Sequence, residues 1–446
     1  MGGSFWRFAA SWVMGLMVLS ASQLQREASL DAERVKHLQL ERLKWSLRQA
    51  WMVPHLRRKW AEAGVSPDSL KTLEDLRRFP FTTIEDFRMN FPYGMLAVPL
   101  SKVVRLHMSS GTTGDPKVVA YTARDIEVWS RLMARGLACI GVDAGDILVN
   151  TANHNVFTGG LGILQGAEML GATAVPLGPV GSERTLELLS KLGATVIHAI
   201  PSFGLRLAEA ARSMGIDPSE ELKLRIGLFG AEPWSEQARR RIEEGLGLTA
   251  YDNYGLSELC GPGVAIECVE RDGLHVWSDY FIPEVVDPET GEPLEDGEEG
   301  ELVLTALWKE AMPVIRYRTG DLCKITHEPC ECGMVHPRIS RIKGRIDDMI
   351  IIKGVNVFPS QIESVVMEFP ELTDNFQIVL SKEGPYDAMT VIVEVRREAW
   401  DRRDELKRQL ERRLRDVVLL RIGVECVEEG SLPRPKGKAR RVVDRR

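Results

Sequence analysis

The segment 107–120, HMSSGTTGDPKVVA, combines hydroxyl side chains, glycines and a lysine directly after an apolar run. Glycines allow backbone angles that other residues resist, so successive N–H groups can converge on an anion. The hydroxyls add donors and Lys117 adds a positive charge. This composition predicts a phosphate-binding loop, and a plain turn between a strand and a helix is the alternative. The loop residues are Ser109, Ser110, Gly111, Thr112, Thr113 and Gly114.

The overall composition is that of an ordinary globular protein. The chain has 446 residues, and a chain of this length should form two or three domains. The formal net charge of −7 argues against nucleic acid as the main partner. Seven cysteines, an odd number in a long chain, do not resemble a secreted disulfide framework. We therefore expect reduced thiols and a cytoplasmic protein.

The N-terminus has more than one interpretation. Arg7 precedes a mostly apolar stretch over residues 8–19, and small residues follow at 20–22, as in a signal peptide or short anchor. The stretch is too short to span a bilayer comfortably, so a membrane partner is not expected. An amphipathic lead helix or a misplaced start codon is the alternative. Residues 1–30 are therefore an N-terminal extension of open role.

The order of apolar patterns predicts an α/β fold. Between about residues 100 and 250, short apolar runs alternate with amphipathic stretches, which is typical of a parallel sheet wrapped by helices. After Tyr251, strands punctuated by glycine and proline predict a β-rich subdomain. We expect a large N-terminal domain over 31–346 and a small, mobile α+β C-terminal domain over 347–446. The runs that predict strands of the parallel sheet are VVRLHM, DILVNT, ATAVPL, ATVIHA and LRIGLF.

Five further segments accompany the loop: GAEPW (230–234), YDNYGLSE (251–258), YRTGDL (317–322), RIKGRIDDMIIIKG (341–354) and PKGKARR (435–441). Together with FTGGLG and KGVNVFPSQIE, they resemble the adenylate-forming superfamily of acyl-CoA synthetases, most closely its phenylacetate-CoA ligase branch. The resemblance runs from about Leu38 to the C-terminus. It implies an enzyme that uses ATP and Mg²⁺ to adenylate a carboxylic acid. The acyl group then passes to coenzyme A, and AMP and pyrophosphate are released.

The resemblance also implies roles for single residues. The opening loop with Lys117 would hold the β- and γ-phosphates, and Glu258 would be the magnesium partner near the α-phosphate. Asp321 would accept hydrogen bonds from both ribose hydroxyls, and Arg345 would contact ribose or phosphate. Tyr254 and the 230–232 segment would line the adenine slot. The full set of further nucleotide-binding residues is Gly230, Ala231, Glu232, Asp252, Tyr254 and Gly255.

Residues near the domain boundary and in the tail complete the implied site. Asp347 corresponds to the hinge about which the C-terminal domain rotates. The KGVN loop, with Lys353 and Gly354, would face the active site during thioester formation, and a charged surface turn is its alternative. Lys438 would bridge the carboxylate and α-phosphate oxygens during adenylation. Lys436 is a rival, and composition alone indicates only a solvated basic run.

A separate set of residues could bind a metal. Two thiols in a CxC pair, a third thiol and an imidazole would make a closed tetrahedral zinc site, which is structural rather than catalytic. The residues are Cys268, His275, Cys330 and Cys332. Reduced cysteines in loops are the alternative, and Cys260, Cys323 and His336 are rival ligands.

The acid pocket should lie beside Phe157, with residues 200–203 and the 230–231 backbone contributing. Its apolar and aromatic lining suits an aryl or arylalkyl acid. Phenylacetate-type sequences carry tyrosine and glycine just before FTGGLG, whereas this chain reads TANHN over 151–155. The exchange predicts a roomier or more polar acid, and a substituted aromatic acid is the leading expectation. A role for His154 stays open.

Two other functions remain alternatives. The enzyme could load the acyl group onto a carrier-protein thiol, although the chain contains no carrier domain. A catalytically silent nucleotide- or metal-binding protein is the other alternative. The presence of Lys117, Glu258, Asp321, Arg345 and Lys438 opposes it. The oligomeric state is open, with a homodimer as one expectation.

Overall fold

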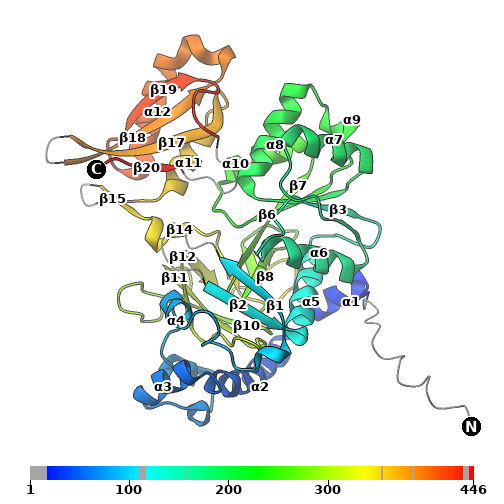
Figure 1. Cartoon of the computed structure of the whole chain (residues 1–446). Helices are drawn as coiled ribbons and strands as arrows, with labels where there is room; N and C mark the ends of the chain where they lie inside the picture. Colours follow the sequence, from blue (N-terminus) through cyan, green and yellow to red (C-terminus); the bar gives the residue numbers. More distant parts are fainter. Residues whose placement is uncertain (1–17, 110–116, 157, 353–354, 384–385, 435–440) are drawn as a thin grey trace, which may run out of the picture.

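The computed structural model of the chain describes residues 18–109, 117–156, 158–352, 355–383, 386–434 and 441–446. Figure 1 shows a large N-terminal domain and a smaller C-terminal domain. The expected α/β fold class is confirmed. Every helix in the described part is too short or too polar to cross a membrane.

The first described residues pack onto the large domain. Helix α1 (Ala21–Ala28) lies against α5 (Ala123–Cys139), where Gln25 donates a hydrogen bond to the carbonyl of Ala138 and Arg131 pairs with Glu27. Leu19 and Leu24 are buried. The part of the 1–30 extension that the structure describes is therefore an integral layer on α5. The helices that follow it are α2 (Ala32–Trp51), α3 (Pro54–Glu62) and α4 (Ile84–Met89).

The opening loop joins two antiparallel strands. Strands β1 (Val103–Ser109) and β2 (Lys117–Thr122) form a separate two-stranded sheet in which Ser109 lies opposite Lys117. The expectation that VVRLHM belongs to the parallel sheet is wrong. So is the alternative of a turn that leads into a helix. An apolar run indicates a strand but neither its burial nor its partner, and β1 is in fact only partly buried, with Val104 and Leu106 on the surface, which explains the error.

One twelve-stranded sheet runs through the large domain, in the order β10-β11-β12-β13-β9-β8-β7-β6-β5-β3-β4, with β14 beside β12. The half that comes first in the chain is parallel and has five strands, of which the first four are the remaining predicted runs. The strands are β3 (Ile147–Asn150), β4 (Thr173–Val175), β5 (Val196–Ala199), β6 (Ile226–Gly230) and β7 (Thr249–Leu256). The surrounding helices are α6 (Gly159–Leu170), α7 (Ser182–Leu192), α8 (Pro201–Met214), α9 (Pro218–Glu221) and α10 (Glu236–Leu246).

The second half of the same sheet is antiparallel and makes up the β-rich region that the glycine and proline punctuation predicts, although as part of one sheet with the parallel half. Its strands are β8 (Cys260–Glu267), β9 (Leu274–Val276), β10 (Phe281–Val286), β11 (Glu299–Ala306), β12 (Tyr317–Thr326), β13 (Arg338–Ile339) and β14 (Gly344–Arg345). Because β7 and β8 pair directly, the parallel and antiparallel halves form one continuous sheet (Figure 1).

The C-terminal domain begins after a short 3₁₀ turn, Ile346–Asp348. Its four-stranded sheet has the order β19-β18-β17-β20, and the last strand runs parallel to β17. Its α11 contacts α10, and its β17 contacts α8 of the large domain. The elements are β15 (Ile350–Ile352), β16 (Val355–Val357), α11 (Pro359–Met367), β17 (Leu372–Glu383), β18 (Tyr386–Val395), α12 (Arg403–Val418), β19 (Gly423–Glu428) and β20 (Val442–Asp444).

Candidate active site and metal cluster

Glu258 lies at the centre of the first cluster of side chains. It follows β7 and is buried, and Oε1 accepts hydrogen bonds from the Lys117 ammonium and the Tyr317 hydroxyl. Lys117 begins β2 and Tyr317 begins β12, so three separate elements converge on one carboxylate. Burial is the largest single effect on Glu258 and opposes its ionisation, but the Lys117 charge and the hydrogen bonds from Lys117 and Tyr317 together outweigh it and hold the pKa below its usual value. The arrangement therefore keeps the Glu258 carboxylate ionised and buried, next to Lys117 at the end of the opening loop.

A buried lysine lies near this cluster. Lys309 is fully buried, and its ammonium sits 3.8 Å from the centroid of the Tyr121 ring. Among the described residues, the ammonium has no hydrogen-bond partner. Burial lowers its pKa to about 8, opposed by the negative charges of Asp125 and Glu258. Lys309 therefore adds a second cation beneath the Glu258 cluster, and its main contact is with an aromatic face.

Asp321 forms the second cluster, on β12. Its Oδ2 accepts a hydrogen bond of 2.6 Å from the Tyr254 hydroxyl, and Oδ1 accepts one of 3.2 Å from Arg345. Arg345 is on β14, directly opposite Asp321 in the sheet register. Between them, Gly320 has a φ of +76°, and a Cβ there would lie 3.0 Å from the Arg345 guanidinium. Burial raises the pKa of Asp321, and the Arg345 charge opposes the rise.

The GAEPW segment follows β6. A Cβ on Gly230 would lie 2.4 Å from the main-chain oxygen of Asn253, so only glycine fits at this close approach. Ala231 has a φ of 70°, an unusual conformation for a residue with a side chain and one that often marks functional sites. Glu232 accepts a hydrogen bond from the Ser202 amide. The backbone at 230–232 is therefore fixed by its neighbours before any ligand binds.

Two more predicted nucleotide residues lie on β7. Asp252 is buried, and burial next to the Glu267 carboxylate raises its pKa to about 7. Its amide donates to Glu267, which in turn pairs with Arg239. Gly255 packs against the Cys260 carbonyl so closely that a Cβ would clash. Both residues lie on the strand that also carries Tyr254, next to β6.

Several predicted site residues lie outside the described residues: 110–114 of the opening loop, Phe157, Lys353, Gly354, Lys436 and Lys438. The predicted hinge residue, Asp347, is described. It accepts a hydrogen bond of 2.8 Å from Nε of Arg345 within the 3₁₀ turn between the domains. Arg345 thus contacts both Asp321 and Asp347.

Polar side chains lie close together in the region where the acid pocket is expected. His198 donates a hydrogen bond of 2.9 Å to the side-chain oxygen of Asn150, at the adjacent ends of β5 and β3. Both ring nitrogens of His154 and the hydroxyl of Ser202 are buried without a hydrogen-bond partner among the described residues. Burial lowers the pKa of His154, so the ring is neutral at pH 7. Buried polar atoms of this kind normally have a partner, which in such a site is water or a ligand.

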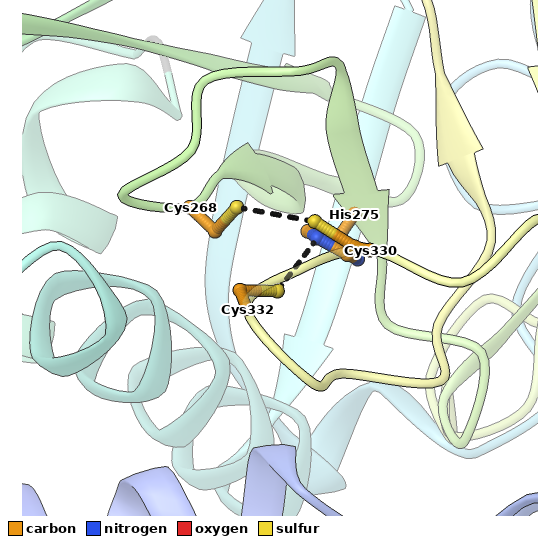
Figure 2. Close-up of side chains that lie close together, drawn as sticks. All are labelled: Cys268, His275, Cys330 and Cys332. Atoms are coloured by element: carbon orange, nitrogen blue, oxygen red, sulfur yellow. Dashed lines mark hydrogen bonds between the residues drawn. The ribbon is translucent and has the colours of Figure 1, made fainter.

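The predicted metal ligands come together. The ligand atoms of Cys268, His275, Cys330 and Cys332 all lie within 4.8 Å of one another (Figure 2). Cys268 follows β8, His275 is on β9, and the CxC pair lies between β12 and β13. The rival ligands Cys260, Cys323 and His336 are not part of this cluster.

The spacing in this cluster fits tetrahedral zinc. With Zn–S bonds of about 2.3 Å, two thiolates would be about 3.8 Å apart, and a thiolate and an imidazole nitrogen about 3.6 Å. The observed separations are 3.7 Å between Sγ of Cys268 and Cys330, and 3.4 Å between Sγ of Cys332 and Nε2 of His275. Nδ1 of His275 lies 3.0 Å from the carbonyl of His336, which makes Nδ1 the donor and leaves Nε2 as the ligand.

Comparisons with known proteins identify the family. Residues 67–306 match the AMP-binding enzyme family, and residues 354–446 match the AMP-binding enzyme C-terminal domain. The chain belongs to the AMP-binding enzymes. Among its relatives, the phenylacetate-coenzyme A ligase of Thermus thermophilus is 45% identical, over 94% of this chain and 98% of that protein. The enzyme of the same name from Pseudomonas putida is 47% identical, over 94% and 95%.

The fold of this AMP-binding enzyme also matches solved structures. A 2-hydroxyisobutyryl-CoA ligase in its postadenylation state is 30% identical, with a TM-score of 0.89 over 94% of this chain and 92% of that chain. The same ligase with CoA in its thioesterification state gives a TM-score of only 0.70, over 94% and 91%. Because the chains and coverage are nearly the same, the difference lies in conformation. The two domains of this protein are therefore arranged more as in the postadenylation state.

The sequence did not identify every residue of the site. Tyr317 and Lys309 were given no role, although Tyr317 contacts Glu258 and Lys309 lies near it. The signal for Tyr317 was its place at the start of YRTGDL, directly before the predicted ribose aspartate. Lys309 could have been noted as a lone cation among buried residues, since Trp308, Ala311 and Met312 around it are all apolar.

Proposed function

We propose that this protein is an AMP-forming acid–CoA ligase whose nucleotide site is built from Lys117, Glu258, Asp321 and Arg345. The observation that carries the proposal is the Asp321 cluster. Its carboxylate is fixed by Tyr254 on one oxygen and Arg345 on the other, and it retains lone pairs for two ribose hydroxyls. The identity to phenylacetate-coenzyme A ligases over nearly the whole chain supports the reaction class.

The reaction has two steps. A carboxylate oxygen of the acid attacks the α-phosphorus of ATP, and the bond to pyrophosphate breaks. The thiolate sulfur of coenzyme A then attacks the acyl carbon, AMP leaves, and the thiol proton goes to solvent. Both steps build negative charge, which fixed cations and donors stabilise.

The residues of the Glu258 cluster act in the first step. Lys117, at the end of the opening loop, neutralises charge on the β- and γ-phosphates. Both hydrogen bonds to Glu258 reach Oε1, so Oε2 is the oxygen that would hold Mg²⁺. A bound magnesium would offset charge on the phosphates. Tyr317 keeps the Glu258 carboxylate oriented for this role.

Lys438 acts in the first step and the KGVN loop in the second, with a domain rotation at Asp347 between them. The likeness to the postadenylation state supports an arrangement from the adenylation side of the cycle. Lys438→Ala should abolish pyrophosphate release while thioester formation from a supplied acyl-adenylate continues. Lys407→Ala, on the exposed face of α12, is the matched control. Equal loss of both steps in Lys438→Ala would refute the assignment.

The acid is an aromatic one of the phenylacetate class that carries a polar substituent. The unpartnered nitrogens of His154 and hydroxyl of Ser202 support a hydrogen-bonding group on the acid. A panel of phenylacetate and its hydroxylated and aminated derivatives, assayed for pyrophosphate release with and without coenzyme A, tests this. Release that needs a carrier protein instead of coenzyme A would favour the carrier-loading alternative. Silence with every acid would favour a binding protein.

The Cys268 cluster holds a structural zinc ion. Four protein donors close the coordination sphere, so no position remains for water. Metal analysis of protein purified without a histidine tag should give one zinc per chain, and less than about half an equivalent would contradict the site.

The enzyme works in the cytoplasm, where ATP is available and thiols stay reduced. A homodimer is the expected oligomer, to be tested by light scattering.

A further inference from the structure

The tail that contains Lys438 is held at both ends by one residue of β17. Arg434 and Arg441 flank residues 435–440, which carry the lysine. Nη1 of Arg434 lies 3.4 Å from Oδ1 of Asp374, and Nη1 of Arg441 donates a 3.0 Å hydrogen bond to the main-chain oxygen of the same residue. Both arginines that flank the lysine segment therefore contact Asp374. We call Leu432–Arg434 the first stem and Arg441 the second stem.

The first stem is fixed by a buried carboxylate. Glu394, on β18, has no exposed surface, and its Oε1 accepts hydrogen bonds from the Leu432 amide at 2.8 Å and from Asn375 at 3.1 Å. Its Oε2 accepts a third from Thr373. Asn375 also donates to the Leu432 carbonyl at 3.2 Å. Both polar groups of the Leu432 backbone are thereby held by side chains of the sheet.

The second stem is fixed just as closely. The Arg441 guanidinium lies over the Phe376 ring, 4.0 Å from its centroid, and Nε is 3.6 Å from Glu363. The Arg441 carbonyl accepts a 2.7 Å hydrogen bond from the Ile378 amide, where β20 begins to pair with β17. Neither the backbone nor the side chain of Arg441 can shift without breaking these contacts.

We infer that Thr373, Asp374, Asn375 and Glu394 form a cradle that positions the tail lysine for adenylation. The inference rests on the proposed role of Lys438 and adds residues that touch neither substrate nor nucleotide. In general, fixing both ends of a short chain segment limits the positions that a residue between them can take. A displacement of about 1 Å at a reacting group can cost about 100-fold in rate, so such positioning matters.

The choice of residues supports a positioning role over simple stability. A buried carboxylate is costly to desolvate, and apolar residues of similar volume usually stabilise a sheet as well or better. Here the carboxylate binds the backbone of the first stem, at the end of the sheet where β17 begins and β18 finishes. The side chains of Asp374 and Glu394 both bond to the first stem, so the cradle should matter most for the step that uses Lys438.

The test measures the two half-reactions separately. In Asp374→Asn and Glu394→Gln, pyrophosphate release should fall roughly 10- to 100-fold, while thioester formation from a supplied acyl-adenylate changes less than about twofold. Asp387→Asn is the matched control. Asp387 pairs with Arg446 on the same sheet, beyond the tail segment, and this variant should leave both steps unchanged. Equal loss in both steps, or no loss in either, would overturn the cradle.

A double variant separates this inference from the proposed function. If the cradle acts through the lysine, adding Asp374→Asn to Lys438→Ala should cause no further loss of the residual pyrophosphate release that the single variant retains in a sensitive assay. Independent, multiplicative losses would contradict the cradle. Normal adenylation by Lys438→Ala alone would instead refute the role of the lysine. If Glu394→Gln fails to fold, as judged by its thermal unfolding, Asp374→Asn still decides the question because Asp374 keeps its main-chain contact to Arg441.

Discussion

The Tyr254 hydroxyl donates a hydrogen bond of 2.6 Å to Asp321, across the 67 residues that separate the two in sequence. The contact joins β7, in the parallel half of the sheet, to β12, in the antiparallel half. Burial raises the pKa of Tyr254 well above its usual value, and the negative charge of Asp321 raises it further. The hydroxyl therefore stays protonated and acts as the donor to Asp321. The pair therefore presets the orientation of the carboxylate that would bind ribose.

Tyr254→Phe should weaken ATP binding without unfolding the protein. A hydrogen bond to a charged group contributes about 1.5–3 kcal/mol, so the KM for ATP should rise about tenfold or more. Steady-state kinetics with varied ATP measures this. Tyr93→Phe, at an exposed tyrosine, is the control and should match the wild type. An unchanged KM for ATP in Tyr254→Phe would exclude the ribose role of this pair.

Tyr317→Phe should alter the magnesium dependence of adenylation. The change removes one of the two hydrogen bonds to Oε1 of Glu258 and leaves Lys117 in place. A less fixed carboxylate should need more magnesium and give a rate about tenfold lower. Magnesium titrations of pyrophosphate release measure the shift. A magnesium curve identical to that of the wild type would show that Tyr317 only packs in the core.

Loss of zinc should loosen the antiparallel half of the large domain. Cys268→Ser removes one donor, so zinc content and Tm should both fall. Cys426→Ser, on β19 of the other domain, should change neither. Because thiolates and neutral imidazole bind the metal, zinc should dissociate progressively as the pH falls. Zinc retention in Cys268→Ser would point to different ligands.

Glu363→Gln should raise stability at high pH only. Burial raises the pKa of Glu363 to about 7, Arg441 opposes the rise, and the Glu232 carboxylate adds to it. Between about pH 4 and 7 the unfolded chain loses the proton while the folded protein keeps it, so wild-type stability falls as pH rises. The variant cannot ionise and avoids up to about 3 kcal/mol of this loss.

Thermal unfolding at pH 5 and pH 8 tests the Glu363 prediction. The Tm of Glu363→Gln should exceed that of the wild type at pH 8 and approach it at pH 5. Glu405→Gln, at a half-exposed partner of Arg402, serves as the control with no pH-dependent difference. A gain at pH 5 as large as that at pH 8 would mean that ionisation of Glu363 is not the cause.

Four of the five strands of the parallel half, β3 to β6, were predictable because each is a short apolar run between turn residues. Strand β1 looked the same in sequence, yet it pairs with β2, because pairing depends on which chain segment lies beside it and not on its own composition. The Cys268 cluster was predictable because few residue types bind zinc. Its ligands come from segments that β9 and β13 bring together by direct pairing.

Other parts of the site could not be predicted for a similar reason. Tyr317 is an aromatic residue in a buried strand, which is indistinguishable in sequence from a core residue. Glu394 follows an apolar run in β18, where a lone glutamate normally marks the solvent face. Only the fold shows that it is fully buried beneath the first stem. Long-range contacts of single polar residues leave no periodic signal.

The separation of the two sheets has an engineering consequence. Tyr254 and Asp321, which are proposed to form the ribose site, lie on the continuous twelve-stranded sheet, whereas Asp374 and Glu394 of the cradle lie on the four-stranded one. The residues proposed to bind the nucleotide and the acid therefore belong to the large domain, whereas the cradle proposed to act in adenylation belongs to the C-terminal domain. Exchanging residues 349–446 for those of a related ligase should change the rate of adenylation toward that of the donor ligase. The preference among acids should stay that of this enzyme.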